Sequence, residues 1–201
     1  MKKGHIAIEG LPGVGKTFLC EALATSDHLP EYEYAEEGAA TNLFLPLYYG
    51  DPSRWALSFQ LSILASRSAD AVKGVSNPTL YDRSLFGDYA LARASVVQGL
   101  MTSDEWRLYE QWWKLVYKQH KAAGMVPRLL VFLEAPAAVC HERAMARGRA
   151  GEGGLTQRHL EIVAQTYQTT LTWMGSRDVR VITIPWDPYG EPDAVGYLLH
   201  T

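Results

Sequence analysis

The stretch GLPGVGKT at residues 10–17 constrains the fold more than any other part of the chain, because it matches the pattern G-x-x-x-x-G-K-[ST] in full. An apolar run at residues 6–8 precedes it, and apolar residues at positions 18, 19, 22 and 23 follow with the i, i+4 spacing of a helix. The motif requires this order of strand, loop and helix. The order predicts the first unit of a parallel α/β sheet.

The glycines of this stretch let the backbone turn so that successive N–H groups point inward, and the helix that follows adds its partial positive charge. Such a nest binds a polyphosphate. Lys16 is expected to reach the β- and γ-phosphates, and the Thr17 hydroxyl to contact Mg²⁺. The candidate ligands of ATP or GTP are therefore Gly10, Leu11, Pro12, Gly13, Val14, Gly15, Lys16 and Thr17.

Length and composition limit the remaining possibilities. A chain of 201 residues is long enough for one α/β domain with a full core, and 47% hydrophobic with 20% charged residues is ordinary for a soluble globular protein. With a formal charge of −3 and no run of basic residues, neither nucleic acid nor a membrane surface is expected as a partner. The N-terminal apolar run is too short for a signal peptide, and Cys20 and Cys140 are expected to be buried thiols. A cytoplasmic location is expected.

Strand and helix patterns alternate along the chain. Besides residues 6–8, strands are predicted at 32–35, 79–81, 128–133 and 179–184, with helices between them, whereas residues 43–49 show neither period. The continuous apolar run at 128–133 is typical of a strand buried on both faces. The predicted architecture is a single domain over 1–201, with a five-stranded parallel sheet covered by helices on both faces.

Three arginines, Arg143, Arg147 and Arg149, lie within seven residues and precede a glycine-rich patch. Their mutual repulsion suggests an anionic partner. A transferring phosphoryl group spreads negative charge over its oxygens, and arginines that close over it stabilise that charge. Residues 143–155 are therefore predicted to form a lid that closes and excludes water.

Acidic residues follow two of the predicted strands, where open α/β sheets bind ligands. Asp82 follows the strand at 79–81 and is a candidate Mg²⁺ ligand. Glu36 and Glu37 follow the strand at 32–35, and either is a candidate general base for an acceptor hydroxyl.

A wide aromatic stripe, made by Trp106, Tyr109, Trp113 and either Val116 or Tyr117, recurs at helical spacing. Such a stripe more often packs in a core or a subunit contact than it binds a ligand.

The motifs together resemble the deoxyribonucleoside kinases of the deoxycytidine, deoxyguanosine and deoxyadenosine kinase group, from the phosphate loop to the lid. The matching positions, in family order, are Glu37-Gly38-Ala39, then Tyr49, Pro52, Trp55, Phe59-Gln60 and Arg67, then Asp82-Arg83-Ser84 with Asp88, and finally Arg143, Arg147, Arg149 and Glu152. The resemblance implies a P-loop kinase that phosphorylates the 5′-hydroxyl of a deoxynucleoside, and a homodimer joined through helices.

For the reacting groups, the resemblance implies that Glu37 takes the proton from the 5′-hydroxyl, that Arg83 orients that hydroxyl and the phosphoryl group, and that Asp82 helps to hold Mg²⁺. Gly38 stands where the family usually has proline, which leaves Glu36 open as the base, although the spacing to Asn42 favours Glu37.

For the acceptor, the resemblance implies that Tyr49 and Glu152 bind the 3′-hydroxyl and that Gln60, Arg67 and Asp88 read the base. An amide both donates and accepts in one plane, and a carboxylate fixed by arginine accepts from an exocyclic amine. This pattern resembles members that accept purines and cytosine better than thymine.

Base stacking is expected to rest on Phe59 alone, because Ala92 stands where many members carry an aromatic residue. The smaller side chain is expected to enlarge the base pocket and to favour a purine.

Three other functions remain open. A nucleoside monophosphate kinase of the thymidylate kinase type would use Arg67 on an acceptor phosphate, although Glu152 would repel such a group. A nucleotide-gated binding protein needs no three-arginine clamp, and a small-metabolite kinase is a residual option. Residues 185–189 lie where a donor base would be contacted, but the sequence does not decide between ATP and GTP.

Overall fold

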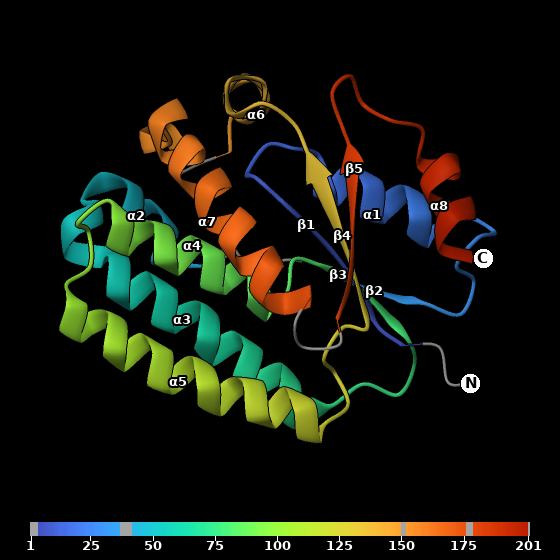
Figure 1. Cartoon of the computed structure of the whole chain (residues 1–201), viewed down its shortest axis with the longest axis horizontal. Coiled ribbons are helices and arrows are strands. Elements are labelled where there is room, and N and C mark those ends of the chain that lie inside the picture. The colour runs from blue at the N-terminus through green and yellow to red at the C-terminus, as the bar shows by residue number, and fades with distance from the viewer. Residues whose placement is uncertain (1–3, 37–41, 150–151, 176–178, 201) are drawn as a thin grey trace.

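The computed structural model of the protein describes residues 4–36, 42–149, 152–175 and 179–200. Its centre is a five-stranded, wholly parallel sheet in the order β2-β3-β1-β4-β5 (Figure 1). The strands are β1 (Ile6–Gly10), β2 (Glu33–Ala35), β3 (Thr79–Asp82), β4 (Leu129–Glu134) and β5 (Arg180–Pro185). The predicted five-stranded parallel sheet is confirmed.

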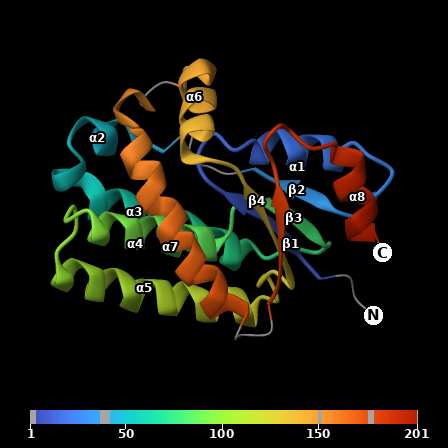
Figure 2. The ribbon, with the colours of Figure 1, turned by 45° about the horizontal axis from the view of Figure 1, so that its top comes forward.

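The helices form layers on both faces of the sheet. Their bounds are α1 (Lys16–Ala24), α2 (Leu45–Gly50), α3 (Pro52–Lys73), α4 (Leu85–Val97), α5 (Ser103–Ala122), α6 (Ala137–Arg147), α7 (Gln157–Gly175) and α8 (Pro192–His200), with a 3₁₀ turn, η2 (Glu152–Gly154). Helices α1 and α8 lie side by side at one face, and α3, α4, α5 and α7 pack together at the other (Figures 1 and 2).

The strand register brings the chemistry to one edge of the sheet. Ile8 is paired with Asp82, and Gly10 with Leu133, so β1, β3 and β4 end together where the glycine-rich loop begins. Strands β1 and β3 are buried along their whole length, and this packing fixes where the residues just past their ends leave the sheet. The predicted crevice therefore lies at the carboxyl ends of the central strands.

Local sequence explains where the longest helices begin. The Asp51 carboxylate accepts a hydrogen bond from the Arg54 N–H at 3.2 Å, and Pro52 needs no N–H partner in the first turn of α3. Thr102 and Glu105 form a reciprocal capping box at the start of α5. These caps satisfy amide groups that a helix end leaves without partners.

The aromatic stripe of α5 lies mainly in the core. Tyr109, Trp113 and Val116 are buried within the protein, whereas Trp112 and Leu115 on another face of the same helix are about half exposed. The amphipathic pattern therefore predicted the core-facing side of α5 correctly.

Two helices were not predicted. α2 has six residues and a proline in its first turn, so it is too short to display a helical period. α8 begins at Pro192 and contains Gly196, which obscure its pattern.

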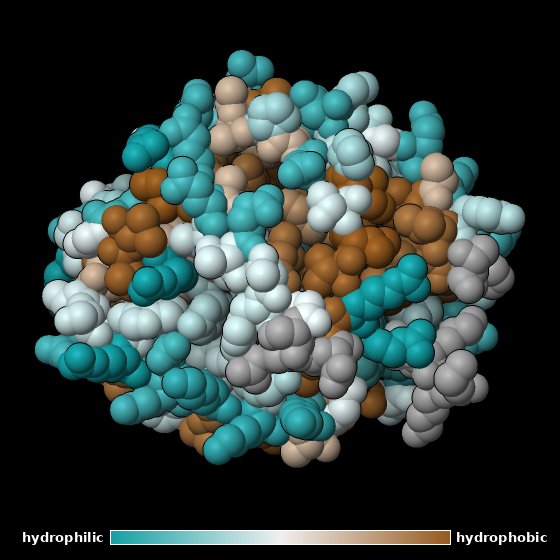
Figure 3. Space-filling view, in the orientation of Figure 1, coloured by the Kyte–Doolittle hydropathy of each residue, from teal (hydrophilic) through white to brown (hydrophobic). Residues whose placement is uncertain are grey.

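Edge strand β5 is only partly buried, and Figure 3 shows apolar side chains gathered over its region of the surface.

Two further expectations concern burial and length. Cys20 and Cys140 are free and buried, and burial raises the pKa of both thiols, so they are inert at neutral pH. Among the described residues, no helix combines the length and apolar character needed to cross a bilayer.

Candidate active site

The glycine-rich loop joins β1 to α1 and depends on glycine at specific positions. Gly13 has φ 81°, and a Cβ there would collide with the carbonyl oxygen of Cys140. Gly15 has φ 109° and lies against the ring of Tyr189. The Lys16 ammonium group bends back over the loop and donates to the carbonyls of Gly10 and Leu11, at 3.3 and 3.1 Å. Lys16 is thus held where a phosphate on the loop would meet it.

Thr17 and Asp82, each a candidate Mg²⁺ ligand from the sequence, meet beneath the loop. The Thr17 hydroxyl donates to Asp82 Oδ2 at 2.6 Å, and Asp82 is almost fully buried. Its other oxygen, Oδ1, is buried and finds no hydrogen-bond partner within the described residues. A buried carboxylate oxygen without a donor is costly, and this observation points to a cation as the missing partner.

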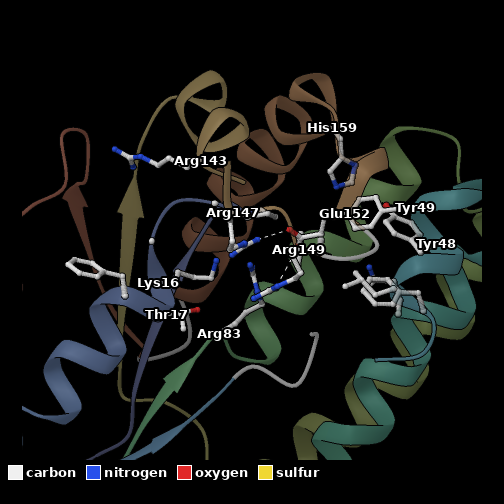
Figure 4. Close-up of a pocket in the computed structure, with 18 of the residues that line it drawn as sticks. Lys16, Thr17, Tyr48, Tyr49, Arg83, Arg143, Arg147, Arg149, Glu152 and His159 are labelled. Carbon is white, nitrogen blue, oxygen red and sulfur yellow. Dashed lines mark hydrogen bonds and ion pairs between the residues drawn. The ribbon is translucent and has the colours of Figure 1, made fainter. Parts of the chain in front are cut away.

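A cavity of about 240 Å³ extends from the loop toward α2 and α3. Its phosphate end is lined by Gly13, Gly15, Lys16 and Thr17, and its far end by Leu45, Tyr48, Tyr49, Phe59, Gln60, Leu91 and His159. Arg83, Arg147, Arg149 and Glu152 lie between the two ends (Figure 4). The structure therefore brings most of the predicted site residues into one cavity.

The three predicted lid arginines divide into two groups. Arg147 pairs with Glu152 Oε2 at 2.7 Å, and Arg149 pairs with Glu152 Oε1 at 3.3 Å. Arg143 instead pairs with Asp187 Oδ1 at 2.8 Å, and its guanidinium lies 3.9 Å from the ring centre of Tyr189. Figure 4 shows Arg143 apart from the other two arginines. Only Arg147 and Arg149 face the middle of the cavity with Glu152.

Aromatic rings form the wall at the far end of the cavity. Tyr48 stacks on Phe59 with ring centres 5.1 Å apart, and it also contacts Tyr49. Gln60 is buried beside Phe59 but still lines the cavity. An apolar wall with one amide is well suited to a planar heterocycle.

Arg67 and Asp88 lie behind the cavity wall and are not among the residues that line it. Arg67 Nε donates to Asp88 Oδ2 at 2.9 Å, with both side chains largely buried. Ala92 is fully buried, and its neighbour Leu91 faces the cavity instead. The expected enlargement of the base pocket at Ala92 thus has no direct counterpart on the cavity wall.

His159, on α7, lines the cavity but was not predicted from the sequence. Gln98 Nε2 donates to the carbonyl of Ala94, which turns its Oε1 toward His159 Nδ1 at 3.1 Å. Burial lowers the pKa of His159 to about 4, so the ring is neutral at neutral pH. No periodicity distinguishes this histidine from other polar residues of the helix, so only the fold reveals that it lies on the cavity wall.

Arg83 is buried and lines the middle of the cavity. It has φ 72°, and its N–H donates to the Ile8 carbonyl at 3.0 Å, which fixes the turn between β3 and α4. Of the two candidate bases, Glu36 is exposed just past β2 and does not line the cavity, whereas Glu37 lies outside the described residues.

A parallel sheet in this order, a glycine-rich phosphate loop at the end of its central strand and an arginine-containing segment across the cavity define a P-loop kinase fold. A solved structure titled as deoxyadenosine kinase from M. mycoides with bound dATP matches with a TM-score of 0.83 and 17% identity, covering 99% of this chain and 100% of that one. A second structure titled as the same enzyme with bound dCTP matches with a TM-score of 0.79. These matches establish the fold.

The family model for deoxynucleoside kinase matches residues 6–188, and the chain therefore belongs to the deoxynucleoside kinase family, enzymes that phosphorylate deoxynucleosides. Deoxyguanosine kinase of Dictyostelium discoideum is 26% identical over 94% of this chain and 66% of that protein. Deoxyadenosine kinase of the same organism is 26% identical over 97% of this chain and 77% of that protein. The family resemblance inferred from the motifs is confirmed.

Proposed function

We propose that the chain transfers the γ-phosphate of ATP, or of another nucleoside triphosphate, to the 5′-hydroxyl of a purine deoxynucleoside or deoxycytidine. One observation carries the proposal: a single cavity has a phosphate-binding loop at one end and an aromatic wall with a buried amide at the other. A nucleoside at the aromatic end would present its sugar to the phosphates. Relatives named as deoxyguanosine, deoxyadenosine and deoxycytidine kinases support this acceptor class.

The reacting centre would lie between Lys16 and the lid. Lys16, Arg147 and Arg149 would stabilise charge that develops on the transferred phosphoryl group, and Arg83 would orient it against the acceptor hydroxyl. Glu37 would accept the proton, with Glu36 as the alternative base. Arg143 would contribute through its contacts with Asp187 and Tyr189, which lie beyond β5 where a donor base is expected.

Thr17 and Asp82 fit a Mg²⁺ ion that accompanies the donor. Mg²⁺ prefers oxygen ligands and is usually held by one or two carboxylates together with substrate phosphates and water. The Thr17 hydroxyl and the unpartnered Asp82 Oδ1 supply such ligands, directly or through water. When bound, the ion would neutralise charge on the β- and γ-phosphates.

The acceptor would be held by groups of two kinds. Tyr49 and Glu152 would bind the 3′-hydroxyl, and because Glu152 already joins Arg147 and Arg149, sugar binding would be sensed by the lid. Gln60 would contact the base edge and Phe59 its face. Arg67 and Asp88 would read the base from behind the present wall, through a shift of the side chains around them.

The contacts of Arg67 argue against a monophosphate acceptor. Its guanidinium donates to Asp88 and to the carbonyl of Arg83, at 2.9 and 3.2 Å, so it is already engaged with a carboxylate that an acceptor phosphate would have to displace. An acceptor phosphate would also meet the carboxylate of Glu152, which repels it. Neither observation favours a thymidylate kinase type of reaction.

We further propose a cytoplasmic homodimer that needs no nucleic-acid partner. A groove of about 420 Å³ lies between α3 and α5, lined by apolar side chains that include Leu61, Leu64, Trp112 and Leu115. An exposed apolar face of this kind is typical of a subunit contact. Light scattering that gave a monomeric mass at micromolar concentration would contradict the dimer.

The function is tested by measuring phosphoryl transfer from Mg-ATP to the four deoxynucleosides and to their four monophosphates, with a Glu37→Gln variant in parallel. We expect turnover of a deoxynucleoside and a loss of roughly a hundredfold or more in the variant, as removal of a general base causes. Turnover of a monophosphate alone would overturn the acceptor assignment. A Glu36→Gln control should phosphorylate the deoxynucleoside at the rate of the parent. That result would assign the role of base to Glu37 and not to Glu36.

A further inference from the structure

Glu9, the residue before the first glycine of the loop, is fully buried although it carries an ionisable group. Its Oε1 accepts from the N–H and the hydroxyl of Ser84, at 2.7 and 2.6 Å, and from the N–H of Gly87 at 3.2 Å. Burial raises the pKa of Glu9, and this effect outweighs the charge of Arg83 and the donors of Ser84, which lower it. Because these neighbours donate hydrogen bonds, they fit a carboxylate better than a carboxylic acid.

Tyr167, on α7, connects this carboxylate to Arg83. Its hydroxyl lies 2.9 Å from Glu9 Oε2 and 2.5 Å from Arg83 Nη1, and Arg83 Nη1 is itself 3.9 Å from Glu9 Oε2. A guanidinium has no acceptor atom, so it must donate to the tyrosine oxygen. The single hydroxyl proton is therefore directed to Glu9, and the network has one direction, from Arg83 through Tyr167 to Glu9.

The hydrogen-bonded network of Glu9, Tyr167 and Arg83 leaves no room for a side chain at position 87. A Cβ on Gly87 would collide with both Glu9 Oε2 and the Tyr167 hydroxyl. Gly87 has no left-handed φ that would require glycine, so the space taken by the network accounts for the missing side chain. Residues of β1, α4 and α7, far apart in sequence, thus meet around the Glu9 carboxylate beside the Arg83 guanidinium.

We propose that Glu9 and Tyr167 are positioning residues that hold the Arg83 guanidinium in its catalytic orientation, an inference that rests on the role given to Arg83 in the proposed function. An arginine side chain has many rotamers, and a transition-state contact is effective only when it is preorganised. A buried guanidinium also needs a compensating charge, which Glu9 supplies. Neither Glu9 nor Tyr167 lines the cavity, so both act through Arg83.

The test compares Tyr167→Phe and Glu9→Gln with Thr170→Val, a matched control on α7. Thr170 is also buried, but among the residues that the structure describes its hydroxyl donates only to the carbonyl of Thr166 in its own helix. In the deoxynucleoside kinase assay we expect kcat to fall about tenfold or more in the first two variants with KM nearly unchanged, since misplaced groups lose transition-state contacts. The control should stay within about twofold of the parent, because the Thr170 hydroxyl bonds within its own helix and takes no part in the contacts of Glu9, Tyr167 and Arg83.

A double-mutant cycle shows whether the loss passes through Arg83. In an Arg83→Lys background, Tyr167→Phe should cost less than about threefold, because residues that act as a unit are not additive. Full additivity, or a Tyr167→Phe variant with unchanged kcat, would overturn the proposal. Tyr167→Phe keeps the ring in place, so it remains informative where Glu9→Gln fails to fold.

A second measurement does not depend on turnover. The Nε–Hε resonance of Arg83, assigned by its loss in Arg83→Lys, should be sharp and protected from exchange in the parent and in Thr170→Val. It should broaden in Tyr167→Phe and Glu9→Gln. A signal that stays unchanged in both variants rejects the positioning role even if the parent phosphorylates no deoxynucleoside, in which case the proposed function fails separately.

Discussion

Arg67 donates from Nη2 to the backbone carbonyl of Arg83 at 3.2 Å, while its Nε donates to Asp88. The arginine proposed to orient the base-reading carboxylate therefore also supports the residue assigned to the reacting centre. This contact joins α3 to the turn between β3 and α4. In the proposed function, base recognition and phosphoryl transfer would therefore share one hydrogen-bonded unit.

Asp88→Asn is expected to damage both stability and base selection. The change keeps the shape but leaves the largely buried Arg67 guanidinium without its anionic partner, which should lower the free energy of unfolding by about 2–4 kcal/mol. Urea denaturation measures this loss, and kcat/KM for each deoxynucleoside measures selectivity. The matched control is Asp104→Asn, because Asp104 pairs with Arg107 at 2.8 Å in an exposed position and should contribute at most about 1 kcal/mol. Equal losses of unfolding free energy in Asp88→Asn and Asp104→Asn would contradict the claim that Asp88 balances a buried charge.

Asp82→Asn is expected to weaken the response to Mg²⁺. An amide in place of the carboxylate can still accept from Thr17 but ligates a divalent cation poorly, so kcat should fall roughly a hundredfold and more Mg²⁺ should be needed for half-maximal rate. Initial rates at varied Mg²⁺ and fixed ATP measure both effects. Glu134→Gln serves as the control, because Glu134 ends the neighbouring strand β4 but is exposed. An unchanged Mg²⁺ dependence in Asp82→Asn would remove Asp82 from the metal site.

His159 should make stability depend on pH. Its folded pKa, about 4, lies below the ordinary value of 6.5, so the unfolded chain binds the extra proton first as the pH falls. The contribution is therefore complete above pH 6.5 and is lost progressively toward pH 4. Between pH 7 and 5 we expect His159→Gln to reduce the change in unfolding free energy by about 2 kcal/mol. His5 and His120, whose pKa values burial also lowers, would leave a residual slope in the same direction. An unaltered slope in the variant would show that His159 is not the titrating group.

The sequence predicted the elements whose signals are local. The glycine-rich loop, the apolar run of β4 and the aromatic stripe of α5 each carry a period or motif, and each was placed correctly. His159 and Leu91 escaped prediction because a cavity wall is made by the packing of α4 and α7, and no spacing within one helix reveals which residues face it. Glu9 was missed for the same reason, since a carboxylate in an apolar strand gains its partners only when β1, α4 and α7 meet.

The lid illustrates the limit of spacing arguments. Arg143, Arg147 and Arg149 lie close in sequence, and a single cluster was predicted from that closeness. Arg143 lies one turn before Arg147 on α6. The guanidinium of Arg143 pairs with Asp187, which lies beyond the end of β5, and not with Glu152. The position of that carboxylate depends on the tertiary fold.

This division of the lid leads to different kinetic expectations for two arginines. Arg147→Gln should lower kcat by roughly 10²- to 10³-fold, because it removes a cation from the middle of the cavity, where charge develops in the transition state. Arg143→Gln should chiefly raise KM for the nucleotide donor, because Arg143 holds Asp187 and Tyr189, while kcat should change by less than about tenfold. Steady-state kinetics at varied ATP and saturating deoxynucleoside separates the two parameters. Arg158→Gln, at an exposed position on α7, controls for the loss of one positive charge. If Arg143→Gln lost as much kcat as Arg147→Gln, then Arg143 would have to turn from the edge of the cavity toward its middle during turnover. The ion pair between Arg143 and Asp187 would then be broken at the catalytic step.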